Sequence, residues 1–361
     1  MNSTALEFSR ETLIAFASLP FLTPARTAKL LGAFPRQTAL SLVSGERLAT
    51  VLNITAEQAE LVRNSLQCPP CGKNARQGCD RVVTLVDEAY PALLREIADP
   101  PPALFYHGDP GLLDTPSVAV VGSRRASAYG LNAAARLSRE LASAGVTIVS
   151  GLARGIDAAA HLAALNAGAK TVAVLGTGID VSYPRSNRSI FERISESGLL
   201  VTEFPHGTPP RAMNFPVRNR IISGLALGTV IVEANGRSGS LITARMAAEQ
   251  GREVFAVPGS IFNTGCEGTH RLIQYGAKLV HDVDDIFDEL PQIRPAISRK
   301  RHESKPDPLA CLIPRDEPIG LDMLAMKTGR EVSELAGDLL RLEMDGAIRQ
   351  VGGGRYVRHE E

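Results

Sequence analysis

Glycine and arginine recur together in five short segments of this 361-residue chain, and each segment comes after a run of apolar, β-branched residues. A glycine lets an anion approach backbone N–H groups closely, and an arginine can hold a phosphate through two parallel hydrogen bonds. The pattern therefore predicts the binding of a phosphate-bearing ligand. The candidate residues are Gly122, Ser123, Arg124, Gly151, Arg154, Gly155, Gly176, Gly178, Arg185, Arg218, Asn219, Arg220, Ser238, Gly239 and Ser240.

The apolar runs before these segments predict short buried strands. They are Val118–Val121, Thr147–Val149, Thr171–Leu175, Leu199–Thr202, Thr229–Val232 and Val254–Val257. Helical stretches such as Leu131–Ala144 and Ile242–Gln250 separate most of them. Repeated strand–helix units are typical of an α/β fold with a Rossmann-like parallel sheet. Because ligands bind beyond the carboxyl ends of such strands, we expect the candidate residues to gather along one edge of the sheet.

The chain divides into five segments. Residues 1–66 predict a small helical domain of the SAM or helix-hairpin-helix type, because apolar residues recur there at helical spacing. Residues 67–115 predict a connector with some local structure, and residues 116–290 predict the Rossmann-like core. Residues 291–306 are polar and basic and predict a linker. Residues 307–361 predict a winged-helix-like domain.

Two local signals refine the first two segments. Thr55 followed by Gln58 resembles a capping box that opens a helix. Leu104, Phe105 and Tyr106 are compatible with a short strand inside the connector.

The last segment predicts two helices followed by a small hairpin. The helices are Leu321–Thr328 and Val332–Met344, and the hairpin strands are Ile348–Val351 and Arg355–Val357. The second helix carries mixed charge, whereas a helix that reads duplex DNA is more basic. We therefore favour a role in protein contacts, or a weak accessory role, over duplex reading.

Composition limits the possible classes of protein. Lysine plus arginine and aspartate plus glutamate number 39 each, so a surface for a polyanion must come from local clustering. No apolar run approaches the roughly 18 residues of a membrane span, and the first residues do not resemble a signal peptide. We expect a cytoplasmic protein without a membrane partner.

Three of the five cysteines lie close together as Cys68, Cys71 and Cys79. Thiolates at this spacing can converge on zinc, although a fourth ligand would have to come from Cys266, His107 or Asp80. An incidental loop is favoured, and no metal or cofactor is expected, but the zinc alternative stays open.

Familiar nucleotide signatures are missing from the predicted strand ends. The first loop reads VGSRRASAYG rather than G-x-G-x-x-G, no acidic residue ends the second strand, and no P-loop sequence occurs. Several separated basic segments suit an extended polyanion such as a single strand of nucleic acid. Tyr183, Phe204 and Phe215 are the aromatic residues placed to stack on bases.

Six segments resemble, in order, the consecutive motifs of the DprA/Smf DNA-processing family over about residues 117–280. They are VAVVGSRRASAYG, SGLARGIDAAAH, LGTGIDVSYPRSN, FPVRNRIISGLA, SGSLITARMAAEQGREVFAVPGS and EGTHRLIQYGA. The resemblance implies single-stranded DNA binding, protection of incoming DNA in natural transformation, loading of the RecA recombinase, and a homodimer formed through the Rossmann domain. It also implies that Arg124 and Arg185 contact DNA and that Arg218, Asn219 and Arg220 line the same groove.

Other readings of these residues remain open. Arg218 and Arg220 could pair with Glu203 or Glu233, and Asp157 could simply cap a helix. No catalytic partner is evident for His161 or His270, nor is a base evident for Ser238 and Ser240, so we expect a binding protein rather than an enzyme.

Two other functions compete with this one. A nucleotide hydrolase or phosphoribohydrolase of related fold is the main alternative. Such enzymes carry a P-G-G-x-G-T-x-x-E signature. This chain has Pro258-Gly259-Ser260, and Gly268-Thr269 follows later without the expected glutamate. A transcription regulator that reads duplex DNA with residues 307–361 is the second alternative.

Overall fold

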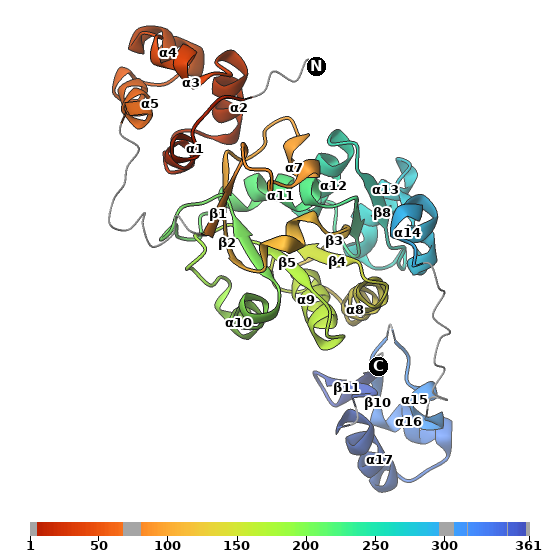
Figure 1. Ribbon diagram of the computed structural model, residues 1–361. Coiled ribbons are helices and arrows are strands. Elements are labelled where there is room, and N and C mark those ends of the chain that lie inside the picture. Colours follow the sequence, from red (N-terminus) through yellow and green to blue (C-terminus); the bar gives the residue numbers. More distant parts are fainter. Residues whose placement is uncertain (1–5, 68–80, 296–306, 316, 345, 359–361) are drawn as a thin grey trace.

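The computed structural model describes residues 6–67, 81–295, 307–315, 317–344 and 346–358 (Figure 1). A nine-stranded sheet lies at its centre in the order β1-β2-β6-β5-β4-β3-β7-β8-β9. Strands β3 to β9 run parallel, whereas β2 is antiparallel to both β6 and β1. The strands are β1 (Val82–Thr84), β2 (Ala103–Gly108), β3 (Ser117–Val121), β4 (Thr147–Ser150), β5 (Thr171–Val174), β6 (Leu199–Thr202), β7 (Gly228–Ile231), β8 (Glu253–Ala256) and β9 (Lys278–Leu279).

The predicted α/β class with a parallel sheet is confirmed, and the six predicted strands correspond to β3 through β8. The short strand predicted at Leu104, Phe105 and Tyr106 is present as part of β2. The structure adds that β1 and β2, within residues 81–115, belong to the same sheet as the core strands. Val82, Leu104 and Phe105 are buried there, and β2 pairs with β6. Because β6 lies far from β2 along the chain, the local sequence pattern could not predict that these two strands pair.

Helices cover both faces of the sheet. Val118 and Val120 of β3 pack with the helices α8 and α9, whereas Ala119 and Val121 pack with α11 and α12 on the opposite face. This alternation follows from the two-residue period of a strand. The helices of this part are α7 (Ala92–Arg95), α8 (Ala128–Ser143), α9 (Ile156–Asn166), α10 (Arg188–Ser197), α11 (Asn214–Leu225), α12 (Ser240–Glu249), α13 (Glu267–Gln274) and α14 (Val283–Glu289).

The N-terminal residues form a small helical domain, as predicted. Its helices are α1 (Arg10–Ala17), α2 (Pro24–Ala33), α3 (Gln37–Ser41), α4 (Gly45–Leu52) and α5 (Ala56–Gln67). The capping box at the start of α5 is present, because the backbone and side chain of Thr55 exchange two 3.2 Å hydrogen bonds with Gln58. The apolar core of these helices is continuous with that of one face of the sheet.

The C-terminal residues form the predicted winged helix with its own apolar core. Both predicted helices and the hairpin are present, and a short strand and a short helix precede them. The elements are α15 (Pro308–Leu312), β10 (Ile319–Gly320), α16 (Leu321–Thr328), α17 (Val332–Met344), β11 (Ile348–Val351) and β12 (Arg355–Arg358). No helix in the described ranges is both long enough and apolar enough to span a bilayer.

His161 on α9 is fully buried, as expected for a structural histidine. Its Nδ1 lies 2.8 Å from the hydroxyl of Thr171. Burial, with a smaller contribution from the nearby charge of Arg218, lowers the pKa of His161 from its usual 6.5 to about 3. The folded protein therefore keeps this imidazole neutral over most of the acidic range.

We predict that this histidine contributes to acid unfolding. Between about pH 6.5 and pH 3 the unfolded chain binds a proton at His161 that the folded chain does not bind. The unfolding free energy should therefore fall as the pH falls, with a limiting slope of about 1.4 kcal/mol per pH unit from this group. Urea unfolding of His161→Gln at several pH values should show a shallower slope than that of the unchanged protein. Equal slopes for the two proteins would contradict the assignment.

Candidate nucleic-acid interface

A pocket of about 610 Å³ opens at the carboxyl edge of the parallel sheet. Segments that follow β3, β4, β5 and β7 contribute to its wall, and so does α11. Eight of the fifteen predicted residues line it: Gly122, Ser123, Arg124, Arg218, Asn219, Ser238, Gly239 and Ser240. Arg125, Asn235, Arg237 and Thr243 also line the pocket and were not selected from the sequence, although all but Thr243 lie in the same glycine- and arginine-containing segments.

Two arginines and two aromatic rings form one cluster in the pocket. The guanidinium carbon of Arg124 lies 5.3 Å from the ring centre of Phe215, and that of Arg218 lies 6.0 Å from it. The ring of Tyr183 lies 5.4 Å from Phe215, centre to centre. Gly176 makes room for this cluster, because a Cβ atom there would approach the Phe215 ring to 2.8 Å. Phe204, the third aromatic candidate, does not line the pocket.

Arg218 forms the floor of the pocket, and its side chain is buried. Its guanidinium donates hydrogen bonds to the backbone oxygens of Gly151 (2.9 Å) and Val174, which belong to the ends of neighbouring strands. Burial lowers the pKa of Arg218 to about 10, and the nearby carboxylate of Asp157 opposes that shift. Arg218 therefore braces α11 against β4 and β5.

Asp157, which was considered as a simple helix cap, has a wider structural role. Its buried carboxylate accepts the N–H groups of Gly151 (3.1 Å) and Ala153 (3.3 Å) and lies next to Arg218. Burial raises the pKa of Asp157, whereas the charge of Arg218 and these two hydrogen bonds lower it. The carboxylate thereby holds the loop that carries Arg154.

Gly155 joins the loops that follow β3 and β4. Its φ is +74°, a left-handed conformation that glycine adopts at low cost, and a Cβ atom there would collide with the backbone oxygen of Ser123. The next residue, Ile156, donates its N–H to that same oxygen at 3.2 Å. Arg154 is thereby held on the exposed side of the loop, outside the residues that line the pocket.

Arg220 lies away from the pocket. Its buried guanidinium forms ion pairs with Glu203 at 2.7 Å and with Asp99 at 3.3 Å. Burial raises the pKa of Glu203, and Arg220 opposes this shift. The pairing with Glu203 that the sequence left open is thus present, while Glu233 accepts a 2.6 Å hydrogen bond from the hydroxyl of Ser127.

Arg185 lines a separate hollow of about 610 Å³, together with Arg188 and Asp180. Arg185 is exposed, and it begins the short 3₁₀ helix η3 (Arg185–Asn187). Gly178 lies at the start of the same connection, and its N–H donates to the backbone oxygen of Thr208 at 2.9 Å. Tyr183, which lines the first pocket, belongs to this connection between β5 and α10 as well.

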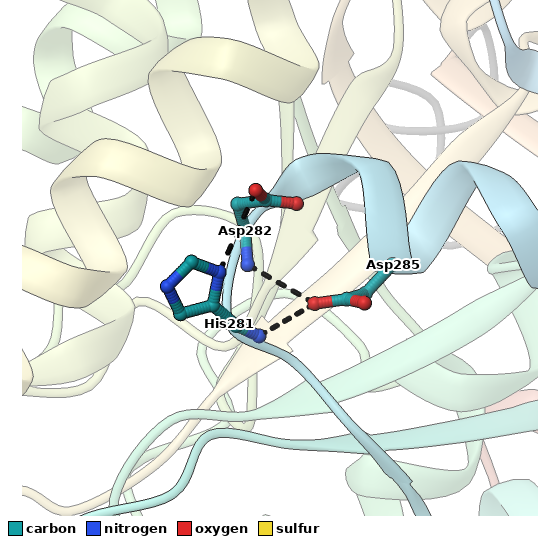
Figure 2. Close-up of side chains that lie close together, drawn as sticks. All are labelled: His281, Asp282 and Asp285. Carbon is teal, nitrogen blue, oxygen red and sulfur yellow. Dashed lines mark hydrogen bonds and ion pairs between the residues drawn. The ribbon is translucent and has the colours of Figure 1, made fainter.

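One group of side chains among the described residues has a spacing that a metal ion could bridge: His281, Asp282 and Asp285 (Figure 2). Its geometry is that of a helix cap. Asp285 accepts the N–H groups of His281 at 2.7 Å and Asp282 at 3.2 Å, which forms the capping box of α14. These hydrogen bonds explain the cluster without a ligand.

The cysteine group Cys68, Cys71 and Cys79 lies outside the described residues, as does Asp80. Of the other two residues considered as a fourth ligand, Cys266 is buried and Nδ1 of His107 lies 2.8 Å from the guanidinium of Arg81. The possible zinc site therefore stays an open prediction.

The buried position of Arg218 predicts that this side chain matters first for stability. Arg218→Met should lower the unfolding free energy by about 3–5 kcal/mol, because Asp157 is left as a buried carboxylate without its cation. Arg124→Met, at an exposed position in the same pocket, should change it by no more than about 0.5 kcal/mol. Urea unfolding at pH 7 measures both.

A second substitution separates charge from packing. Adding Asp157→Asn to Arg218→Met removes the unpaired charge and should recover part of the loss. Unchanged stability of Arg218→Met would show that the pair does not brace the pocket floor.

Residues 81–291 match the family described as DNA recombination-mediator protein A, and residues 300–354 match the DprA winged helix domain. Protein Smf of Escherichia coli is 45% identical over 282 residues, which cover 75% of each chain. The DNA processing protein DprA of Streptococcus pneumoniae is 48% identical over 206 residues, which cover 57% of this chain and 73% of that one.

Solved structures agree with this assignment. The crystal structure of S. pneumoniae DprA matches with a TM-score of 0.66 and 36% identity, over 78% of this chain and 98% of that chain. DprA of Helicobacter pylori, whose structure is described for its single-stranded DNA binding mode, matches with a TM-score of 0.54 and 31% identity, over 59% of this chain and 97% of that chain. This chain therefore belongs to the DNA recombination-mediator protein A family, which comprises the DprA and Smf DNA-processing proteins.

Proposed function

We propose that this protein binds single-stranded DNA in the pocket at the carboxyl edge of its sheet. The main observation that supports this proposal is the pocket itself, which is open to solvent and combines exposed arginines with aromatic rings. Exposed Arg124, Arg125 and Arg237 would hold phosphates, and Tyr183 and Phe215 offer faces for bases. The H. pylori relative supports the choice of single-stranded DNA.

The wall of the pocket offers further donors to a phosphate. Ser238, Gly239 and Ser240 lie at the start of α12, where the helix dipole favours an anion and the two serine hydroxyls can donate hydrogen bonds. Asn219 extends from α11 toward this segment, with its amide 3.5 Å from the backbone oxygen of Gly239. We assign the phosphate contacts to these groups and to the exposed arginines, and we assign Arg218 and Arg220 to the support of α11.

Arg154 and Arg185 extend the proposed path beyond the pocket. Both are exposed, one in the loop after β4 and the other in the hollow after β5. Gly151, Gly155, Gly176 and Gly178 contribute through the shape of the loops between them. A strand that crosses neighbouring strand ends would meet a cation at each one.

Family membership supports a wider role for the bound DNA. In this proposal the protein protects incoming DNA during natural transformation and passes it to the RecA recombinase. The same resemblance supports a homodimer formed through the Rossmann-like domain, in the cytoplasm. Light scattering of the purified chain tests the dimer, and a strand-exchange assay with RecA tests the loading.

The proposal describes a binding protein rather than an enzyme. In the described part of the pocket, the hydroxyl of Ser238 lies 2.8 Å from that of Ser240 rather than beside a base. His161 is buried against Thr171, and Nε2 of His270 lies 3.0 Å from the backbone oxygen of Gly259. The competing nucleotide hydrolase is tested by incubation with nucleoside monophosphates, where robust turnover would favour the enzyme.

Removing two exposed arginines should weaken DNA binding without unfolding the protein. We expect Arg124→Ala combined with Arg185→Ala to reduce affinity for a short single strand at least tenfold. The slope of log affinity against log salt should become shallower by roughly 0.7 for each lost phosphate contact. Fluorescence anisotropy at several salt concentrations measures both quantities.

A matched double variant in the helical domain serves as the control. Arg36→Ala with Arg47→Ala removes two exposed arginines far from the carboxyl edge and should leave affinity and slope unchanged. Unchanged binding by the Arg124 and Arg185 variant would refute the proposed site.

A further inference from the structure

The winged helix lies against the core through its hairpin side. The amide of Asn132 on α8 donates to the backbone oxygen of Arg315 at 2.8 Å and to that of Arg358, at the end of β12, at 3.2 Å. Arg349 of β11 closes a hollow of about 600 Å³ against α8 and α9. The hairpin is therefore engaged with the core, and Figure 1 shows α17 on the far side of this domain.

The far side of α17 presents an apolar stripe to solvent. Leu335, Leu339 and Leu342 point into the core of the domain. Leu340 and Met344 are 59% and 81% exposed. They share one helical face with three small exposed residues, and this outward face of α17 consists of Ser333, Ala336, Gly337, Leu340 and Met344.

Exposed apolar side chains are concentrated in this domain. Of the fourteen large apolar residues that are exposed in the described part of the chain, six belong to the winged helix. They are Leu312, Met323, Met326, Val332, Leu340 and Met344. Three are methionines, whose flexible side chains suit a surface that adapts to a partner. Leu340 and Met344 lie one turn apart on α17, and contiguous exposed apolar surface of this kind marks interaction sites.

The charged residues around the apolar stripe of α17 indicate which kind of partner can bind there. Residues 317–344 carry six acidic and three basic side chains. Arg330 is paired with Asp338 at 2.8 Å, and Arg341 is paired with Asp307 at 3.4 Å. Glu331 and Asp322 are exposed beside the helices. Such a surface repels phosphates and attracts cations, so duplex DNA is a poor fit.

We propose that the outward face of α17, with Met323 and Met326 of α16, docks an amphipathic helix of a protein partner. The partner helix inserts apolar side chains over Ala336 and Gly337, where the lack of large side chains leaves space between Val332 and Leu340. Basic side chains on both sides of its apolar stripe meet the acidic surroundings. The winged helix then recruits protein while the core holds DNA.

Two synthetic peptides serve as probes for the full-length protein. One is an amphipathic helix with leucines at helical spacing and lysines beside them, and the other has glutamates in place of the lysines. In fluorescence anisotropy we expect the lysine peptide to bind at least tenfold more tightly. Leu340→Ala combined with Met344→Ala should weaken its binding at least tenfold, whereas Leu42→Ala, at an even more exposed leucine of the helical domain, should not.

Substitutions at Gly337 test the role of charge without threatening the fold. A Cβ atom at this position meets no atom within 4 Å, and both lysine and glutamine have a higher helix propensity than glycine. Gly337→Lys should weaken the lysine peptide and strengthen the glutamate peptide, while Gly337→Gln keeps the bulk but lacks the charge and should preserve the preference for lysine. Single-stranded DNA affinity, measured in parallel, should stay the same in every variant.

Several outcomes would overturn the proposal. Equal affinity for both peptides would exclude a charge-selective protein surface. Duplex DNA binding that falls with Leu340→Ala and Met344→Ala, and rises with Gly337→Lys, would identify nucleic acid as the occupant instead. A change of oligomeric state in the same variants would identify a second copy of this chain.

Discussion

The buried guanidinium of Arg218 is the interaction on which the pocket depends. It extends from α11, bonds to the backbone oxygens of Gly151 and Val174 at the ends of β4 and β5, and faces Asp157 on α9. A buried cation is tolerated only when its partners stay in place, so these four elements keep one arrangement whenever the chain is folded. The floor of the pocket is thus a property of the fold. By contrast, the arginines at its rim are exposed, which suits the proposed binding of a flexible strand.

The strands of the core were predictable because each is a compact run of apolar, β-branched residues, and the edge where their loops meet followed from parallel topology. The separate roles of neighbouring residues within one motif were not predictable in this way. The family resemblance implied that Arg218 and Arg220 line the same groove, whereas both lie on α11 and, of the two, Arg218 lines the pocket. Residues two positions apart on a helix point in nearly opposite directions, so one reaches the pocket floor and the other reaches Glu203 and Asp99. Recognising that the helix begins at Asn214 would have separated them.

The net charge of the chain does not indicate how its acidic and basic residues are distributed over the surface. Lysine plus arginine balance aspartate plus glutamate, yet the rim of the pocket is basic and the outward helices of the winged helix are surrounded by acid. The two surfaces therefore attract opposite kinds of molecule. Separation of this type also keeps the acidic side chains from competing with phosphates for the exposed arginines. Under both proposals, a neutral chain thus binds a polyanion on one domain and a basic amphipathic helix on another.

The order of strands in the sheet also determines when each pair of strands can form during synthesis on the ribosome. Strand β2 ends at residue 108, but β6, its partner toward the core, begins at residue 199. At ~5–20 residues per second, β1 and β2 wait roughly 5 to 20 s for that partner after they are made. The preceding helices depend mostly on local contacts and can form at once. The preceding helices can cover apolar side chains of β1 and β2, but the edge of β2 that pairs with β6 stays open during this interval. Pauses before residue 199 therefore lengthen the time in which that strand edge is unpaired.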